Sequence, residues 1–187
     1  MLQWITDFTH KLENQAGESS IVYHLASKYY LDVIKKETIL ANITDKDHIL
    51  CIGSGTCPFS AILFHQITGA KVTAIDNNPI CIPDARQIID RLSIADFVHV
   101  FCQDGSSAEL IFTEYSVIHF ALQIQPIEIV FSQVEKKIAP GTKLLIRRPR
   151  KNLDQIYSQL SSPILALSPY TTHSKARNIG STLLYIK

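Results

Sequence analysis

The stretch His48-Ile-Leu-Cys-Ile-Gly-Ser-Gly-Thr-Cys-Pro58 places a short apolar run directly before two closely spaced glycines. Such a run is typical of a buried strand, and the proline suits the first turn of a helix because its φ is already fixed near the helical value. Gly53 and Gly55 allow a tight turn and let a ligand lie against bare backbone. The stretch therefore predicts a strand, a glycine loop and a helix whose N-terminus offers unpaired N–H groups.

Strand-like and helix-like runs alternate through the rest of the chain. Hydropathy predicts further strands over 70–75, 96–102, 115–121, 142–147, 164–167 and 182–186, and helices over 58–67, 79–92, 127–138 and 152–160. The alternation is typical of a mostly parallel, doubly wound sheet with helices on both faces. Because ligands of such sheets bind beyond the carboxyl ends of the strands, the residues that follow each strand are the first candidates for a site.

The first 44 residues differ from the rest because they contain no convincing strand. Apolar residues from Ile21 to Leu40 recur at helical spacing, and Ser19 or Ser20 suits the N-cap position. We therefore expect a helical cap over residues 1–44 that packs by an apolar stripe on an α/β domain over residues 45–187.

Composition narrows the class of protein. The 187 residues are 46% hydrophobic and 19% charged, with a formal net charge of +1, which suits one packed domain with a short appendage. Near neutrality gives no field that would attract nucleic acid or an anionic membrane. No apolar run approaches the roughly 20 residues of a membrane span, and the N-terminus lacks the pattern of a signal peptide. The four cysteines form no C-x-x-C pair, and the histidines lack metal-ligand spacing. We expect a cytoplasmic protein without a bound metal, with neither nucleic acid nor a membrane as partner; a homodimer is left open.

Acidic residues follow two successive predicted strands. Asp76 closes the second strand, roughly 20 residues beyond Gly53, which is the offset at which an acid binds ribose hydroxyls. Asp104 follows the third strand, where its carboxylate is able to accept a hydrogen bond from an adenine amino group. Together with the glycine loop, these acids predict a nucleoside site. Pro58 stands where dinucleotide sites need a small residue, which disfavours a nicotinamide cofactor.

This arrangement resembles motif I of the class I S-adenosylmethionine-dependent methyltransferases, and Ile138-Ala-Pro-Gly-Thr-Lys-Leu-Leu-Ile146 is similar to the "L-x-P-G-G-x-L" segment before that family's fifth strand. The resemblance covers about residues 46–187. It implies a three-layer α/β/α Rossmann-like domain, a seven-stranded sheet with a reversed last strand, and S-adenosyl-L-methionine as cofactor. The residues that it assigns to cofactor binding are Gly53, Ser54, Gly55, Thr56, Pro58, Asp76, Asn77, Asp104, Gly105, Ala121, Leu122 and Gln123.

One position departs from the family pattern. The family usually carries Glu or Asp two residues before the first glycine, where the carboxylate receives the cofactor's amino group, and this chain has Cys51 there. The amino group therefore needs another acceptor, either a backbone carbonyl or a residue of the helical cap.

A narrower resemblance is to nicotianamine synthase-like proteins, which also lack this acid. Ile52-Gly-Ser-Gly-Thr-Cys-Pro-Phe-Ser60 is similar to their "V-G-S-G-P-L-P-L-T-S", and Glu114-Tyr-Ser-Val-Ile-His-Phe-Ala-Leu122 to their "Y-D-V-V-F-L-A-A-L". The segments over 138–147 and 181–187 resemble their "M-A-P-G-A-x-L-x-x-R" and "S-V-I-I-A-R-K". Those enzymes transfer the aminobutyrate part of S-adenosylmethionine, and they carry a long N-terminal helical domain where this chain has about 45 residues.

We expect an S-adenosylmethionine-dependent methyltransferase that acts on a small or medium acceptor. Two alternatives stay open: an aminobutyrate transferase that makes a metal-chelating amino acid derivative, and a non-catalytic cofactor-binding module that works through a partner. Strand histidines His99 and His119 are expected to be core residues. The candidates for catalysis are Tyr23 and Tyr30, which share a helix face and either attract the sulfonium or pack on the sheet; Gln123, which orients a ligand or caps a turn; and Arg147, which clamps an anion or ends a solvated strand.

Overall fold

The computed structural model describes residues 20–107, 109–157, 160 and 168–187, with side chains from residue 28 onward. The elements in chain order are α2 (Ser20–Ala41), β1 (His48–Ile52), α3 (Phe59–Thr68), β2 (Lys71–Asp76), α4 (Cys81–Arg91), β3 (Val98–Cys102), β4 (Val117–Phe120), α5 (Ile127–Lys137), β5 (Lys143–Pro149), the 3₁₀ turn η1 (Lys151–Leu153), β6 (Tyr170–Thr172) and β7 (Ile179–Ile186). The predicted alternation of strands and helices is confirmed.

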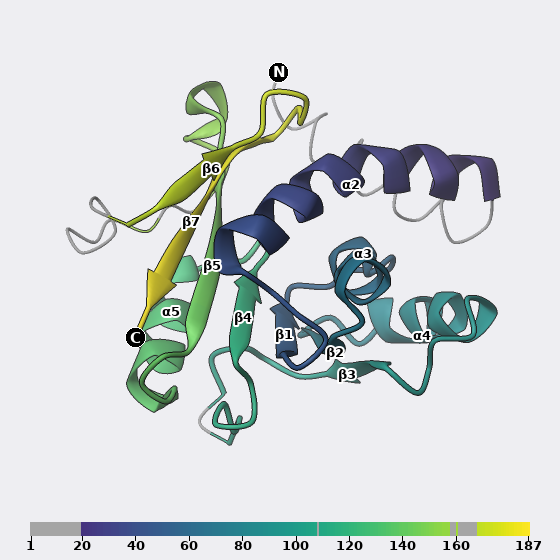
Figure 1. Ribbon diagram of the computed structural model, residues 1–187, viewed down its shortest axis with the longest axis horizontal. Coiled ribbons are helices and arrows are strands. Elements are labelled where there is room, and N and C mark those ends of the chain that lie inside the picture. The colour runs from purple at the N-terminus through teal and green to yellow at the C-terminus, as the bar shows by residue number, and fades with distance from the viewer. Residues whose placement is uncertain (1–19, 108, 158–159, 161–167) are drawn as a thin grey trace.

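The seven strands form one sheet in the order β3-β2-β1-β4-β5-β7-β6 (Figure 1). Strands β1 to β5 are parallel, whereas β7 runs antiparallel to both β5 and β6. The chain moves outward from β1 to β3 and then crosses to β4 on the other side of β1. The switch point therefore lies between β1 and β4, where a doubly wound sheet opens a crevice for ligands.

Helices cover both faces of the sheet, as expected for this class. One apolar cluster joins α2, α3 and α4 to side chains such as Ile49, Val72 and Leu145, and the second joins α5 to Leu50, Ile118 and their neighbours. Alternate residues of the same central strands point to opposite clusters because side chains alternate across a strand. The fold is thus the predicted three-layer α/β/α architecture (Figure 1).

The last third of the chain differs from the expectation. In the described part of the helix predicted over 152–160, which leaves out residues 158–159, only the η1 turn forms; Leu153 N–H bonds there to the carbonyl of Arg150, and Leu153 alone of the η1 residues is buried. The strand predicted over 164–167 lies outside the described residues. Strand β6, which the sequence did not predict, pairs over three residues with β7.

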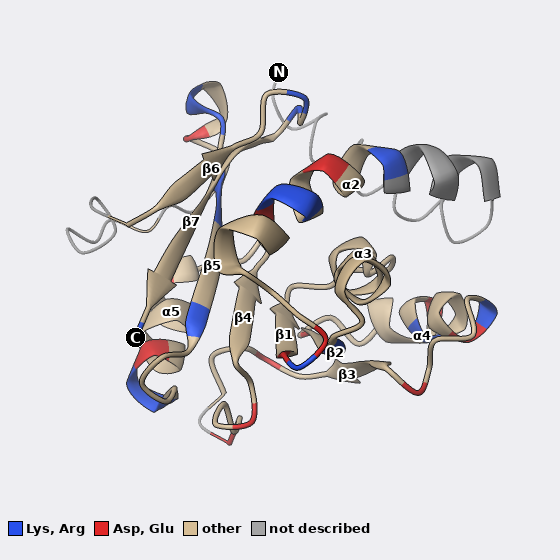
Figure 2. Ribbon diagram, in the orientation of Figure 1, with Lys and Arg blue, Asp and Glu red and all other residues tan. Residues whose placement is uncertain are grey.

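Helix α2 is attached to the sheet by apolar and polar contacts. Tyr30, Val33 and Ile34 are buried against the sheet side, while Figure 2 shows acidic and basic residues at other positions along the helix. The Tyr29 hydroxyl donates to Asn178 Oδ1 before β7. The predicted packing of an N-terminal helix on the α/β core is confirmed, whereas the division of the chain between residues 44 and 45 stays a prediction. Among the described helices, none has the length and apolar character that a membrane crossing requires.

Candidate functional site

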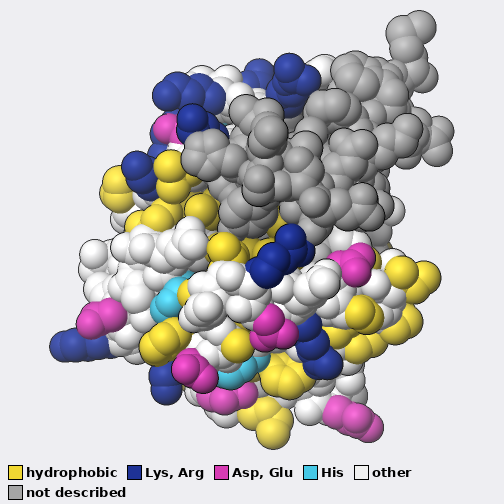
Figure 3. All heavy atoms as spheres, turned by 90° about the vertical axis from the view of Figure 1, so that its right-hand side faces the viewer, with side chains coloured by type: hydrophobic (Ala, Val, Ile, Leu, Met, Phe, Trp, Pro, Cys, Tyr) yellow, Lys and Arg dark blue, Asp and Glu magenta, His cyan; other side chains and the backbone are white. Residues whose placement is uncertain are grey.

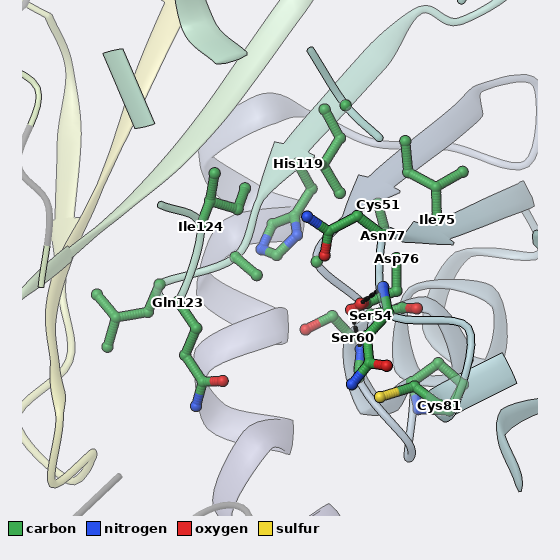
Figure 4. Close-up of a pocket in the computed structure, with 18 of the residues that line it drawn as sticks. Cys51, Ser54, Ser60, Ile75, Asp76, Asn77, Cys81, His119, Gln123 and Ile124 are labelled. Atoms are coloured by element: carbon green, nitrogen blue, oxygen red, sulfur yellow. Dashed lines mark hydrogen bonds between the residues drawn. The ribbon is translucent and has the colours of Figure 1, made fainter. Parts of the chain in front are cut away.

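A cavity of about 860 Å³ opens at the carboxyl ends of the parallel strands (Figure 4). Its walls are the segments that follow β1, β2, β3 and β4, together with Tyr30 of α2, Arg147 of β5 and the chain around Asn178. The position is the one predicted from the order of strands and helices.

The glycine loop after β1 forms one edge of this cavity. Gly53 has φ +81° and Gly55 has φ +63°, a left-handed backbone that side-chain-bearing residues rarely adopt. A Cβ at Gly53 would stand only 3.2 Å from side-chain atoms of Ala121 and Ile124. The backbone N–H groups of Gly53 and Ser54 both donate to the carbonyl of Ile75, at 2.9 and 3.1 Å, which ties the loop to the end of β2.

The two acids that follow β2 and β3 are held by backbone donors. Asp76 accepts from the N–H of Gly55 at 2.8 Å through Oδ2 and from that of Asn78 at 2.9 Å through Oδ1. Asp104 accepts from the N–H and the hydroxyl of Ser106 through Oδ1 alone, both at 2.8 Å. Asp76 therefore joins the glycine loop to the next strand, and both carboxylates keep lone pairs for a ligand.

The structure brings the residues assigned from the sequence together around this one cavity; their role in binding stays a prediction. Three of the four catalytic candidates, Tyr30, Gln123 and Arg147, also line it, and the side chain of Tyr23 lies outside the described part of the chain. The members that line the cavity are Gly53, Ser54, Gly55, Thr56, Pro58, Asp76, Asn77, Asp104, Gly105, Ala121, Leu122 and Gln123.

A buried ion pair stands behind the side of the cavity nearest α2. Glu37 is fully buried and receives two hydrogen bonds from Arg147, from Nε at 2.8 Å and from Nη2 at 2.9 Å, in a bidentate pair. The hydroxyl of Thr182 on β7 donates to the same carboxylate at 2.7 Å. The pair therefore links α2 to β5 and β7, three elements far apart in the sequence.

Burial and attraction oppose each other in this pair. Burial alone would raise the pKa of Glu37, but the charge of Arg147, with the nearby His119 and the hydrogen bonds, lowers it to about 2. Burial would likewise lower the pKa of Arg147, and its attraction to Glu37 raises it instead. Both groups are charged at neutral pH, so this side of the cavity has a compensated pair rather than a free charge.

His119 and Cys51 face the cavity from neighbouring strands (Figure 4). Burial, then the charge of Arg147, lowers the pKa of His119 to about 3, so its ring is neutral. Burial raises the pKa of the Cys51 thiol, so this residue supplies no negative charge in place of the family's acid.

The ring of Tyr30 already has partners within the chain. Phe59 stacks on it with centroids 5.4 Å apart, and the Arg147 guanidinium lies over it at 5.8 Å from the centroid. The guanidinium of Arg147 thus already makes the cation–π contact with Tyr30 that was considered for the sulfonium of the cofactor. We retain Tyr30 as a wall of the cavity.

Sequence reasoning misjudged three charged or polar positions. Arg147 is not a solvated strand end but is 4% exposed and bound to Glu37. His99 is exposed rather than part of the core. Glu37 was missed, although it falls on the buried stripe of Tyr30, Val33, Ile34 and Ala41, and an acid on such a stripe needs a buried partner.

A second cavity among the described residues has a volume of about 290 Å³ and lies against α4 and β3. On the face shown in Figure 3, acidic and basic side chains are interspersed among the described residues. No group of three or more His, Cys, Asp or Glu side chains within the described ranges could hold a metal ion.

The sheet order, the covering helices and the cavity at the switch point define the Rossmann-like fold of the class I methyltransferases. A mutant of MtNAS, a nicotianamine synthase, in complex with S-adenosylmethionine is similar to this chain with a TM-score of 0.80 and 19% identity, over 98% of this chain and 75% of the other. MtNAS in complex with MTA and tNA has a TM-score of 0.78 and 20% identity, over 99% and 74% of the two chains.

An RNA methyltransferase from Salinibacter ruber, in complex with S-adenosyl-L-homocysteine, has a TM-score of 0.56 and 20% identity over 64% of this chain and 81% of its own. No family model and no curated protein matches the sequence.

Proposed function

We propose that the chain is an S-adenosylmethionine-dependent transferase whose reaction takes place in the cavity at the ends of β1 to β5. The observation that carries this proposal is the convergence of the glycine loop with Asp76 and Asp104 on one cavity. At Gly53, whose Cβ would stand 3.2 Å from Ala121 and Ile124, the loop packs so closely on these side chains that only glycine fits, which leaves bare backbone at the edge of the cavity.

Each part of the cavity has a role in this proposal. Asp76 would accept the ribose hydroxyls, Asp104 would accept from the adenine amino group through its remaining lone pairs, and the glycine loop would support the methionine part. When bound, the sulfonium supplies three activated carbons. The chain has to hold an acceptor in line with one of them and to exclude water, which it would do with α2 and Gln123 at the rim.

Methyl transfer to a small or medium acceptor is one use of such a site. Aminobutyrate transfer, as nicotianamine synthase-like proteins perform it, has the more specific support, because the similarity to MtNAS extends over 98% of this chain and so includes most of α2, whereas the similarity to the RNA methyltransferase covers 64%. Helix α2 reaches the cavity through Tyr30, and in this proposal it would contribute to the side on which the acceptor binds.

Two measurements test the proposal: ligand binding tests the cofactor class, and the by-product of the reaction identifies the group that is transferred. At ~100 times its Kd a one-site ligand adds ~2.7 kcal/mol, a rise in melting temperature of roughly 5–11 °C for this length. We expect that rise with S-adenosylmethionine and S-adenosylhomocysteine and none with NAD. Incubation with S-adenosylmethionine and a panel of small amines, followed by chromatography, then distinguishes methylthioadenosine, the by-product of aminobutyrate transfer, from S-adenosylhomocysteine. A shift with NAD alone would contradict the cofactor class, and binding without either by-product would favour a non-catalytic module.

A further inference from the structure

His119 is an unusual residue of the cavity wall. Its side chain is 1% exposed, and neither Nδ1 nor Nε2 has a hydrogen-bond partner. The carboxylate oxygen Glu37 Oε2 lies 3.7 Å from Nε2, beyond hydrogen-bond distance. A buried polar atom without a partner has lost its hydrogen bonds to water without replacement, so an apolar side chain here would make the unliganded protein more stable. This cost points to a partner that a ligand supplies.

The sheet register places this ring beside the missing acid. Cys51 on β1 and His119 on β4 are paired neighbours in the parallel ladder, so their side chains point to the same face, and both line the cavity. Cys51 is an uncharged thiol. Glu37, the carboxylate behind them, is already bound by Arg147 and Thr182. The imidazole is therefore an unpartnered acceptor of the described wall on β4, and the buried hydroxyl of Ser54 is another on the glycine loop.

The chemistry of the ring selects the ligand group. A neutral imidazole carries one N–H and one bare nitrogen. The carboxylate of Glu37 lies on the Nε2 side, which favours the proton on Nε2 and leaves the lone pair on Nδ1. A bare nitrogen of this kind accepts from an amino group.

The position of the nucleoside determines which amino group reaches it. Asp76 and Asp104 lie beyond β2 and β3, on one side of β1, whereas His119 is on β4, on the other side. A nucleoside held by the two acids directs its remaining part across the glycine loop toward β4. In S-adenosylmethionine that part ends in an α-amino group and a carboxylate.

We infer that the imidazole of His119 is the hydrogen-bond acceptor for the α-amino group of the donor's methionine part, in place of a carboxylate on β1. This inference rests on the proposed function. It turns a residue that the sequence analysis assigned to the core into a specificity-determining residue of the cavity.

The test compares ligands that differ in this one group. Calorimetry would measure the binding of S-adenosylhomocysteine, of its analogue with the amino group replaced by hydrogen, and of methylthioadenosine to the wild type, to His119→Phe and to His119→Gln. We expect His119→Phe to bind S-adenosylhomocysteine at least tenfold more weakly and the other two ligands unchanged. His119→Gln, which keeps an acceptor oxygen, should recover most of the loss. His99→Phe, an exposed strand position outside the cavity, is the matched control and should behave as the wild type.

A second measurement requires no variant. In the ¹⁵N spectrum of the wild type, the Nδ1 signal of His119 should shift with S-adenosylhomocysteine and stay in place with the deaminated analogue. Equal losses of S-adenosylhomocysteine and its analogue in His119→Phe, or equal ¹⁵N shifts with both ligands, would overturn the inference while leaving the proposed function in place. Failure of the wild type to bind any of the three nucleosides would overturn both.

Discussion

The backbone at Gly53 controls how closely a ligand can approach the sheet. We predict that Gly53→Val abolishes nucleoside binding, because the side chain would meet Ala121 and Ile124 and would resist a φ of +81°. Gly141→Val is the matched control: its φ is +88°, but a Cβ there has no neighbour within 4 Å. It should cost about 1–2 kcal/mol in unfolding free energy and leave binding intact. Calorimetry on both folded variants checks this, and binding by Gly53→Val near the wild-type level would reduce the loop to a simple turn.

Asp76 is the acid on which ribose recognition depends in the proposed site. Asp76→Ala should weaken S-adenosylhomocysteine binding by about 1–3 kcal/mol, because ribose hydroxyls lose their acceptor and the N–H of Gly55 loses its partner. The control is Asp90→Ala, which removes an exposed carboxylate of α4 outside the cavity. Calorimetry measures both affinities, and unchanged binding by a folded Asp76→Ala protein would remove Asp76 from the ribose site.

Individual site residues could be predicted from the sequence where a local backbone conformation or the end of a strand requires one type of residue. Glycines at 53 and 55 and acids just after β2 and β3 could be predicted because backbone geometry and strand ends determine their place. Glu37 and His119 could not be assigned, since their role depends on partners 110 residues away or on the neighbouring strand. Their environment arises only when α2, β1, β4 and β5 come together.

At the scale of elements, a buried ion pair adds to the apolar contacts that hold α2 on the sheet. Glu37→Gln should lower the free energy of unfolding by about 3–5 kcal/mol, because the buried Arg147 loses its counter-charge. Replacing both residues, Glu37→Leu with Arg147→Met, should recover much of the loss. Urea denaturation measures all three proteins. The control is Asp32→Asn on the same helix, whose 3.5 Å pair with Lys36 is partly exposed and should be worth less than 1 kcal/mol. A loss no larger than that of the control would show that the pair does not hold α2.

The elements that were predicted well have strong local patterns. β1 and α5 begin at the predicted residues because an apolar run or a proline boundary marks them. The described part of the predicted helix over 152–160 instead forms the η1 turn and a further turn, with Leu153 and Tyr157 buried, a spacing of four that is also typical of a helix. Strand β6 is three residues long and depends on pairing with β7, so its own sequence carries little signal.

At the scale of the whole molecule, acid should weaken the fold. Burial, then Arg147, lowers the pKa of His119 from 6.5 to about 3, so the unfolded chain takes up a proton before the folded one as the pH falls through that window. The carboxyl of Glu37, whose pKa falls from 4.5 to about 2 against the effect of burial, acts in the same direction below pH 4.5. The free energy of unfolding should therefore decrease steadily from pH 7 toward pH 3.

Urea denaturation at several pH values checks this dependence. His119→Phe should lose less stability between pH 6.5 and pH 4.5 than the wild type. A remaining slope is expected, because burial also lowers the pKa of His48 and His173. An identical slope in the variant, or stability that rises in acid, would contradict the neutral state of His119 in the folded protein.

The overall fold could be predicted because it is determined by a repeated pattern rather than by any single contact. Five parallel strands, each read from a short apolar run, were enough to place the cavity at their carboxyl ends. The order of β7 and β6 required the family resemblance, since hydropathy does not encode which edge a strand joins. The wall formed by α2 depends on long-range contacts and appears only in the folded molecule.

The buried contacts of Glu37 on α2 have a consequence for folding during translation, because both partners of this residue are synthesised much later. Glu37 leaves the ribosome 110 residues before Arg147 and 145 residues before Thr182. Until those residues emerge, the acid on the apolar stripe has no counter-charge, and closing so long a loop early has an entropic cost without that contact to offset it. Helix α2, the first described element to be synthesised, therefore gains the partners of its buried acid only after β5 and β7 have been made.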